Sequence, residues 1–583
     1  MKSFRSRVTP LIWILRVAKG KLLSILLLLI TQVGMAGLSL GSVWVLRLLL
    51  DEAVAGNRDS FVYYSVLFGG FFLIRIGLYF ANRYLLEYTQ SSLENCYKKR
   101  LFSTLLKKNY ASVTSVHSGE WLNRLTSDAV VVAGSITTIL SDLGSMIVRL
   151  IGSVVMLLLL IPEFVWALIP CTIVFIGISY AFRKVLKKMH VRIQEADGAL
   201  RILLSERLSS LMIVHSFAQE DAAVKDADEA MEKHKHARMA RVRFSNVCNT
   251  GFNFVLRGAY VFGAVYCGAG ILNGSITSLG TFTAVIQLIS QIQAPIANLS
   301  GIVPRYYSMT ASAERLMAAE NFEDDDVKNA HSTPEILSYY ENHFRAFRLE
   351  DLDFSYPPLA HTESVDMPPV LRNLDLTIPK GEYLAFTGPS GSGKSTVLKL
   401  LMCLYRPDHG LRLLVSDDGE EELTANWRGM FAYVPQDNQL LRGTIREVVA
   451  FADPERKNSD DEIWEALQIS CADVFVQELK NGLDTELGER GSGLSEGQMQ
   501  RLAIARAIFS KHPVLLFDEA TNSLDSATEM QVLKNLRQLT DRTLLIVTHG
   551  KAALGFCDRI LRFREGKLIS VDEKQNEKDA VLS

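Results

Sequence analysis

Six long apolar stretches constrain this chain more than any other feature of its sequence. They cover residues 21–50, 61–85, 130–161, 164–185, 252–272 and 279–303. A bilayer core is about 30 Å thick, so about 20 helical residues cross it. In hydrocarbon every backbone amide needs a hydrogen-bond partner, and a helix supplies that partner within its own segment. We therefore predict six membrane-spanning helices in the first half of the chain.

Basic residues between these stretches predict how the helices are oriented, because Lys and Arg are enriched in cytosolic loops. The connection between the second and third stretches holds Lys98, Lys99, Arg100, Lys107 and Lys108. The connection between the fourth and fifth holds Arg183, Lys184, Lys187, Lys188 and Arg192. The remaining connections are short and nearly free of basic residues. We expect an integral protein of a bacterial plasma (inner) membrane, with both termini and the second half of the chain in the cytosol.

The segment before the first stretch is expected to lie on the inner membrane surface. Residues 9–16 mix Leu, Ile and Trp with charge, as an interfacial amphipathic helix does. The alternative is a frayed polar tail. Both long cytosolic connections combine charged residues with periodic Leu, Val and Ile, which predicts helical extensions beyond the membrane.

Composition excludes several classes of protein. The seven cysteines lie far apart, without the close pairs of a disulfide framework or zinc site. A formal net charge of −2 gives no global basic field, so we expect no nucleic-acid partner. The short β-rich runs after residue 347 alternate with helical stretches, which predicts an α/β domain with a largely parallel sheet.

A glycine-rich loop between a predicted strand and a helix identifies a phosphate-binding site. It matches the P-loop pattern and includes Gly388, Ser390, Gly391, Gly393, Lys394, Ser395 and Thr396. The glycines let backbone N–H groups surround phosphate oxygens, and the helix N-terminus adds positive dipole. Lys394 is expected to reach the outer phosphates of ATP, and Ser395 to bind Mg²⁺.

Two carboxylates follow a second apolar strand, residues 514–517. In an α/β sheet, such residues emerge at the carboxyl edge, where ligands bind. We expect Asp518 to hold the Mg²⁺ shell and Glu519 to polarise the attacking water. A surface strand end would look the same, but its position after a P-loop favours the catalytic interpretation.

A third motif, Leu494, Ser495, Glu496, Gly497 and Gln498 followed by Gln500 and Arg501, resembles the signature of ABC transporter ATPases. Over essentially its whole length the chain resembles an ABC exporter half-transporter of the multidrug or lipid-flippase type. The implied fold is multidomain: an all-α six-helix transmembrane domain followed by an α/β P-loop ATPase domain. The predicted parts are a transmembrane domain over 1–312, a linker over 313–346, a nucleotide-binding domain over 347–570 and a polar tail over 571–583. The acidic run 323–326 is expected to be solvated linker.

The resemblance implies roles for further residues. Tyr356 would stack on adenine, Gln436 would lie at the magnesium and membrane-domain interface, Asp525 would act across a dimer and His549 would contact the γ-phosphate. Taken singly, each could be an ordinary packing, surface or capping residue. Residues 486–491 resemble a loop found in exporters, and segments 110–120 and 209–219 would contact ATPase domains.

In this family the signature, here Leu494, Ser495, Gly497 and Gln498, clamps the γ-phosphate of ATP held by another subunit. The resemblance therefore implies a second half-transporter, in a homodimer or a heterodimer. Two positions depart from the family pattern: Glu496 replaces a usual glycine, and Lys551 follows Gly550 where an arginine is usual. The carboxylate of Glu496 could repel phosphate or point to solvent.

Three arginines interrupt the apolar stretches: Arg75, Arg149 and Arg257. Counted from the outer helix ends, they lie about 21, 18 and 23 Å deep. An arginine there costs about 2.5–3.5 kcal/mol, so we interpret the three as a basic belt for an anionic amphiphile. The alternative is that they snorkel or pair with neighbouring helices. We expect ATP-driven export or flipping of an amphipathic substrate in contact with membrane lipid, with a multidrug or peptide exporter as one alternative and an ATP-gated channel or nucleotide-binding regulator as another.

Overall fold

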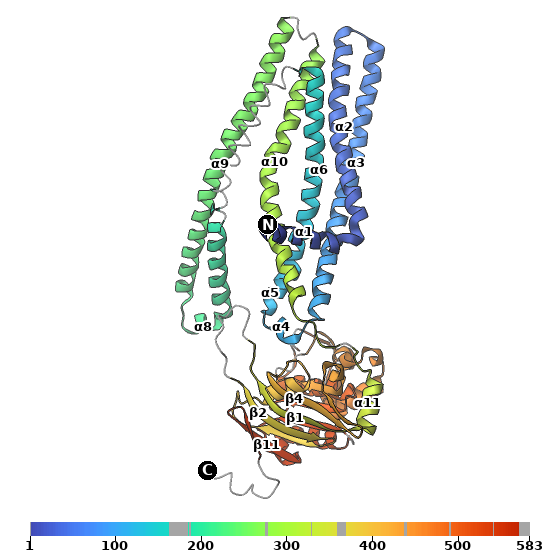
Figure 1. The fold of residues 1–583 in the computed structure, drawn as a ribbon, viewed down its shortest axis with the longest axis vertical. Helices are drawn as coiled ribbons and strands as arrows, with labels where there is room; N and C mark the ends of the chain where they lie inside the picture. Colours follow the sequence, from blue (N-terminus) through green and yellow to red (C-terminus); the bar gives the residue numbers. More distant parts are fainter. Residues whose placement is uncertain are drawn as a thin grey trace. The chain divides into compact units, whose positions relative to one another are not determined.

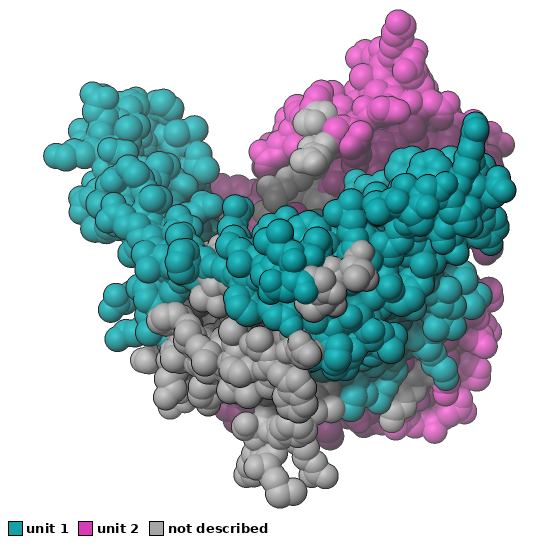
Figure 2. All heavy atoms as spheres, turned by 90° about the horizontal axis from the view of Figure 1, so that it is seen from above, with its two compact units in different colours: residues 1–101, 123–317 teal, residues 102–122, 318–583 magenta. Residues whose placement is uncertain are grey.

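The computed structural model describes residues 2–162, 185, 188–189, 191–273, 278–327, 329–357, 369–436, 440–488, 491, 493–539 and 542–570. The chain forms two compact units, coloured separately in Figure 2. Unit 1 comprises residues 1–101 and 123–317, and unit 2 comprises residues 102–122 and 318–583. Each unit is described by itself.

Unit 1 is helical (Figure 1). Its helices are α1 (Lys2–Val17), α2 (Leu22–Ala55), α3 (Arg58–Leu105, which continues into unit 2), α6 (Ala129–Leu160), α8 (Leu211–Ser216), α9 (Glu220–Leu272) and α10 (Leu279–Ala318). A π-helical turn, Arg124–Asp128, precedes α6. Helices α3 and α9 are much longer than the apolar stretches that they contain, and the placement of their extensions in the cytosol remains a prediction.

Within the described residues, three helical stretches are long and apolar enough to cross a membrane: Pro10–Ala55, Arg58–Leu105 and Ser118–Leu160. They contain the first three predicted spans. The fifth and sixth predicted spans fall within α9 and α10, where Tyr260–Leu272 is a shorter apolar helix. The fourth span lies outside the described residues except for Val185, as do Arg183, Lys184 and Lys187 of the predicted basic connection.

Small residues allow close packing of α2 against α6. A Cβ on Gly152 would meet Leu40 Cδ1 at 2.2 Å, and one on Gly144 would meet Leu29 Cδ2 at 3.2 Å. Small residues at helix interfaces are typical of membrane domains, where packing rather than water exclusion drives association. A different pair, α2 and α3, is joined by a polar contact, in which Gln32 Nε2 donates to Asn82 Oδ1 at 3.1 Å.

The N-terminal segment is helical and packs on α3. Trp13 of α1 is buried and its ring stacks on that of Tyr97 at 5.8 Å, while Tyr97 donates to the Ile14 carbonyl at 3.3 Å. Ile12 and Leu15 remain about half exposed. The amphipathic interpretation of this segment therefore fits the structure better than a frayed tail.

Unit 2 is built on two main sheets. An antiparallel sheet has the order β2-β1-β4-β5, and a six-stranded sheet has the order β12-β11-β3-β10-β9-β6, in which only β12 runs antiparallel to its neighbour. A short pair, β7 and β8, completes the described strands. The strands are β1 (Phe344–Phe354), β2 (Leu371–Pro379), β3 (Tyr383–Thr387), β4 (His409–Ser416), β5 (Gly419–Glu422), β6 (Phe431–Val434), β7 (Gly443–Thr444), β8 (Glu486–Leu487), β9 (Val514–Asp518), β10 (Thr543–Val547), β11 (Arg559–Arg564) and β12 (Lys567–Ser570).

Helices cover both faces of the parallel sheet. The described helices of unit 2 are α4 (Tyr110–Thr114), α5 (Ser118–Asn123, ending in unit 1), α11 (Thr333–Asn342), α12 (Lys394–Leu401), α13 (Ile445–Val449), α14 (Asp460–Ile469), α15 (Asp473–Glu478), α16 (Glu496–Phe509), α17 (Ser526–Arg537) and α18 (Lys551–Phe556). Leu515 and Phe517 of β9 pack into a core with α16, whereas Val514 and Leu516 pack into a core with α12. Burial on both faces explains why this strand is continuously apolar.

The acidic run 323–326 is largely exposed, as expected of a solvated segment, apart from Asp325, which is 20% exposed. Its carboxylates also form ion pairs within unit 2, which the sequence did not predict. Asp324 pairs with Lys108 at 2.8 Å, Asp325 with Arg428 at 2.7 Å and Asp326 with Arg406. The partners lie far away in the sequence, so local composition alone could not reveal them. The predicted domain boundaries otherwise remain predictions, and the tail 571–583 lies outside the described residues.

Candidate nucleotide site

The topology of the parallel sheet brings the predicted catalytic segments to one edge. Strands β3, β10, β9 and β6 are consecutive neighbours and run parallel, so their carboxyl ends meet at the same edge. The P-loop follows β3, His549 follows β10, Glu519 follows β9 and Gln436 follows β6. These segments come from positions up to 161 residues apart by numbering, from 388 to 549, yet the sheet aligns them.

The glycines of the P-loop occupy positions that exclude a side chain. Gly388 has φ 138°, and a Cβ there would lie 2.2 Å from the Phe563 carbonyl oxygen. Gly393 has φ 101°, and its Cβ would lie 2.5 Å from Leu371 Cδ2. Within this loop the hydroxyl of Ser392 is buried and has no hydrogen-bond partner in the described part of the chain. An orphaned donor beside the N-terminus of α12 fits a phosphate ligand.

Lys394 is held inside the loop that it belongs to. Its Nζ donates to the carbonyl oxygens of Gly388 at 2.7 Å and Pro389 at 2.9 Å, and the residue is 5% exposed. Burial lowers the pKa of this ammonium, while the nearby carboxylates of Glu519 and Asp518 raise it. The ammonium group is therefore already close to the place where the loop would bind a phosphate.

Ser395 and Asp518 lie together at the predicted metal position. Ser395 Oγ donates to Asp518 Oδ1 at 2.6 Å, and the Tyr433 hydroxyl donates to Asp518 Oδ2 at 3.0 Å. Asp518 is 3% exposed. A hydroxyl and a buried carboxylate are hard oxygen ligands of the kind that Mg²⁺ prefers. Burial, with the carboxylate of Asp518 adding to it, raises the pKa of Tyr433, which remains a hydrogen-bond donor at neutral pH.

Glu519 is positioned by two amide side chains. Gln436 Nε2 and Asn522 Nδ2 each donate to Glu519 Oε2 at 3.0 Å. The backbone of Glu519 has φ 55°, a left-handed conformation that is unusual for a residue with a side chain. Its N–H donates to the Val547 carbonyl of β10 at 3.0 Å, which fixes this turn against the sheet.

Tyr356 lies beside the P-loop helix. Its hydroxyl is 3.0 Å from Thr396 Oγ1, and its ring meets that of Tyr405 edge-on at 5.3 Å. Burial raises the pKa of the Tyr356 hydroxyl, so the side chain stays neutral. An aromatic ring next to the phosphate loop can stack on a nucleotide base.

The signature residues form the start of helix α16. Ser495 is its N-cap and shares a capping box with Gln498, with Ser495 N donating to Gln498 Oε1 at 2.9 Å. A Cβ on Gly497 would lie 3.0 Å from the Ser523 carbonyl oxygen, so this position favours glycine. Glu496 is exposed in the first turn, beside the positive end of the helix dipole, and Leu494 packs partly buried at the edge of the core.

Asp525 lies at the start of α17 and His549 follows β10, and no hydrogen bond or ion pair between the two is seen in the described residues. Asp525 caps α17 by accepting from the N–H groups of Ala527 and Thr528. Hydrogen bonding to the Thr528 side chain, followed by the hydrogen bonds from the N–H groups of Thr528 and Ala527, lowers the pKa of the Asp525 carboxyl. His549 is exposed at the carboxyl edge and makes no hydrogen bond with another described residue. Ser390 and Gly391 are exposed at the tip of the P-loop.

Two residues of the site were not predicted from the sequence. Tyr433 contacts Asp518, and Asn522 contacts Glu519. Tyr433 lies on β6, three positions before Gln436, and Asn522 lies three positions after Glu519. Neither residue matches a motif by itself. Glu489 and Arg490 of the predicted exporter loop lie outside the described residues.

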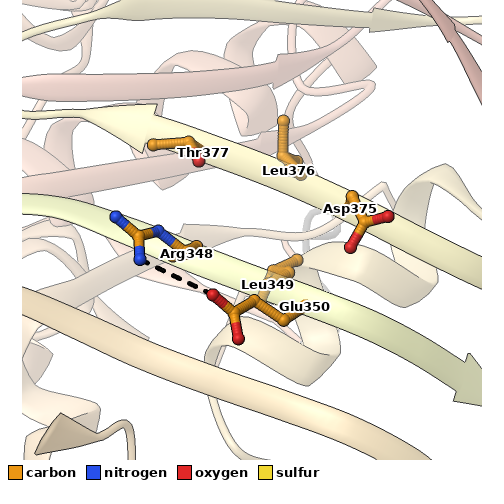
Figure 3. Close-up of a pocket in the computed structure, with 6 residues that line it drawn as sticks. All are labelled: Arg348, Leu349, Glu350, Asp375, Leu376 and Thr377. Carbon is orange, nitrogen blue, oxygen red and sulfur yellow. Dashed lines mark ion pairs between the residues drawn. The ribbon is translucent and has the colours of Figure 1, made fainter. Parts of the chain in front are cut away.

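A separate hollow lies on the antiparallel sheet. It has a volume of about 300 Å³ and is lined by residues of β1 and β2, with Arg348 paired to Glu350 (Figure 3). It is wide open, Arg348 also pairs with Glu420, and Asp375 accepts a hydrogen bond from Asp351 N at 2.8 Å. It contains none of the predicted nucleotide-site residues.

Comparison with known proteins adds independent evidence. The sequence model of the ABC transporter transmembrane region matches residues 22–296, and that of the ABC transporter ATPase matches residues 371–522. An ATP-dependent lipid A-core flippase of Desulfotalea psychrophila is 28% identical over 500 residues, covering 84% of this chain and 83% of the relative. Antigen peptide transporter 2 of Mus musculus is 29% identical over 499 residues, covering 84% and 68%.

A solved structure confirms the fold. A bacterial Atm1-family ABC exporter with ATP bound has a TM-score of 0.76 to this chain at 21% identity, covering 95% of this chain and 94% of that one. The fused membrane and ATPase regions define a transport-coupled ATPase, and the chain binds ATP through its ABC domain. The protein belongs to the ABC transporter family, as an integral membrane exporter of that family.

Proposed function

We propose that this chain is one half of a dimeric exporter that moves an amphipathic molecule across the membrane by alternating access. ATP would lie on the P-loop against Tyr356, with Mg²⁺ held by Ser395 and Asp518 and positioned by Gln436. Glu519 would act as the base for the attacking water, and His549 would contact the γ-phosphate. The Mg²⁺ would neutralise charge on the outer phosphates. The ATPase domain and both termini would face the cytosol.

The exposed start of α16 is the observation that supports the proposed dimer. Ser495 and Glu496 make hydrogen bonds with no described residue outside the first turn of that helix. This exposed helix start, with its dipole, could therefore act on a phosphate of a second subunit, together with Gly497 and Gln498. Asp525 would act across the same interface. The second subunit would be another copy of this chain or a similar half-transporter.

Helix α8 supports contact with another protein surface. Three apolar side chains in or next to this short helix are exposed: Met212 by 86%, Ile213 by 59% and Phe217 by 72%. A cluster of exposed apolar side chains on a cytosolic segment is typical of an interaction site. We propose that residues 209–219 contact an ATPase domain, as do residues 110–120.

Transport can be tested directly in proteoliposomes. ATP should drive translocation of a fluorescent anionic lipid, measured by its accessibility to an external quencher, and Glu519→Gln should abolish it. An ATP-gated channel would instead pass ions with ATP bound and without hydrolysis, so Glu519→Gln would keep that conductance. Conductance of that kind without lipid movement would reject the exporter in favour of the channel.

The three intramembrane arginines are proposed to bind the anionic part of the substrate. Among the described residues, Arg149 Nε is buried and has no hydrogen-bond partner, while Arg75 and Arg257 are exposed in the chain alone. Unpaired arginines in a membrane domain need a wet cavity or an anionic partner. A multidrug or peptide exporter is the alternative, because the relatives include a peptide transporter by name.

Replacing Arg75 and Arg149 with alanine should separate these substrates. We expect at least a threefold greater loss of ATPase stimulation by phosphatidylglycerol than by tetraphenylphosphonium, because only the lipid carries negative charge. Arg58→Ala, on the short connection predicted to face outward, is the matched control. Equal loss of stimulation by both compounds would contradict the arginine site.

Glu496 gives the proposed clamp a further test. Its carboxylate lies at the helix end that would face phosphate. Its negative charge would therefore repel the phosphate that the positive end of the helix dipole attracts. Glu496→Gln keeps the side-chain size and removes the charge, and we expect it to lower the KM for ATP about two- to fivefold. An unchanged KM and rate would show that Glu496 points to solvent in the working dimer.

A further inference from the structure

The C-terminal end of the P-loop helix α12 is held by two arginine side chains. Arg412 donates to the carbonyl oxygens of Leu400 at 2.7 Å and Tyr405 at 2.9 Å. Arg428 donates to the carbonyl oxygens of Met402 and Cys403, each at 3.1 Å. Cations at a helix C-terminus satisfy its free carbonyl groups and its negative dipole. Because α12 has eight residues, these contacts lie only about 12 Å from the phosphate-binding end.

Arg428 also makes a second, two-pronged contact. Its Nη1 lies 2.7 Å from Asp325 Oδ2 and its Nη2 lies 3.1 Å from Asp325 Oδ1. The two side chains are partly buried, with 32% of Arg428 and 20% of Asp325 exposed. Partial burial and bidentate geometry distinguish this pair from an ordinary surface ion pair. One guanidinium therefore joins α12 to the segment that contains Asp325.

That segment, residues 320–325, is here called the strap, because it binds the turn between α3 and α4. Asp325 N donates to the Lys107 carbonyl at 2.9 Å, and Asn109 N donates to the Glu323 carbonyl at 2.9 Å. Lys108 Nζ contacts the carbonyl oxygens of Glu320 at 3.1 Å and Phe322 at 2.7 Å, and the Asp324 carboxylate at 2.8 Å. The Lys108 side chain is only 9% exposed. The strap is thus fixed to the chain that leads directly into α4.

An aromatic contact supports the same arrangement. The ring of Tyr110, the first residue of α4, meets the ring of Tyr405 edge-on at 5.6 Å. The carbonyl of Tyr405 accepts from Arg412, which also binds the end of α12. The N-terminus of α4 therefore touches the turn after α12 from a second side.

We propose that the Asp325–Arg428 pair is a positioning element that transmits nucleotide-dependent movement of α12 to the strap and hence to α4. Phosphates bound at the start of α12 shift the position of the helix. The guanidinium of Arg428 moves with it, because it is hydrogen-bonded to the carbonyl groups at the end of α12. The strap then moves with the Asp325 carboxylate, and it displaces the turn between α3 and α4. This inference rests on the proposed binding of ATP at the P-loop. The physical requirement is that the ion pair carries most of this movement and the Tyr110–Tyr405 contact the rest, so that breaking the pair removes most of the coupling without emptying the nucleotide site.

Amide hydrogen exchange of the full chain in lipid nanodiscs tests the proposal. Saturating Mg²⁺–adenylyl imidodiphosphate should change the exchange of peptides that cover residues 106–116. In Asp325→Ala that change should be at least fivefold smaller, while the Kd for the nucleotide stays within threefold of wild type. Asp325→Asn, which keeps the side-chain shape, should show the same loss, and Asp325→Glu should restore at least half of the change.

Asp326→Ala is the matched control from the same acidic run. Asp326 pairs with Arg406, both side chains are about half exposed, and neither contacts the carbonyl groups at the end of α12. This variant should keep the full exchange change. A full change in Asp325→Ala, a wild type without any change, or a Kd raised more than tenfold by Asp325→Ala would each overturn the proposal. A wild type that does not bind the nucleotide would instead refute the proposed function.

Discussion

Replacing Glu519 with glutamine should lower ATP hydrolysis at least 100-fold and leave ATP binding nearly unchanged. A positioned general base contributes about 10²–10⁴ to the rate, and a glutamine amide cannot take the proton of the attacking water. The remaining side-chain oxygen can still accept from Gln436 and Asn522, which both donate to Glu519 Oε2 at 3.0 Å. Phosphate release gives the rate, and titration with a fluorescent ATP analogue gives the affinity.

The control for this variant is Glu478→Gln, at the exposed end of α15 in the same domain. It should hydrolyse ATP at the wild-type rate. Hydrolysis by Glu519→Gln within threefold of wild type would show that another group acts as the base, and His549 would then be the first residue to test.

Replacing Lys394 with alanine should weaken ATP binding about 10- to 100-fold or more. Each hydrogen bond to a charged group contributes about 1.5–3 kcal/mol, and the lysine would exchange its two carbonyl contacts for phosphate oxygens. The apo domain should remain folded, because the hydrogen bonds of this side chain to described residues go to Gly388 and Pro389 of its own loop. Calorimetric titration with ATP measures the affinity, and thermal unfolding without nucleotide measures the fold.

Lys380→Ala serves as the comparison for Lys394→Ala. Lys380 donates to the Glu341 carbonyl and lies near the Tyr340 ring, away from the P-loop residues. Its loss should leave ATP affinity unchanged. If Lys394→Ala bound ATP as tightly as wild type, the assignment of the phosphate site to this loop would be wrong.

The sequence predicted which strands and loops carry the candidate nucleotide site, because each of them has a local signal. The strand at 383–387, the glycines after it and the apolar helix that follows specify a P-loop without any long-range information. The apolar strand that ends in Asp518 and Glu519 is equally local. Parallel pairing in neighbouring strands then places the segments at one edge, because ligands bind at the carboxyl ends of such strands.

Contacts between residues far apart in the sequence could not be predicted in this way. The ion pairs of residues 323–326 could not be predicted because their partners Lys108, Arg428 and Arg406 lie up to 216 positions away, counted from 108 to 324. Asn522 and Tyr433 became recognisable only when the sheet placed them against Glu519 and Asp518. Such contacts depend on tertiary structure, and no short motif encodes them.

Counting chains per lipid nanodisc, together with ATP hydrolysis by each fraction, tests the central proposal most directly. The P-loop and the exposed signature helix belong to one chain, and each is proposed to act on ATP with its counterpart from a second chain. Discs with a single chain should bind ATP without hydrolysing it, whereas discs with two half-transporters should hydrolyse it and lose that activity with Glu519→Gln. Single-chain discs that hydrolyse ATP at the same rate per chain would contradict this account.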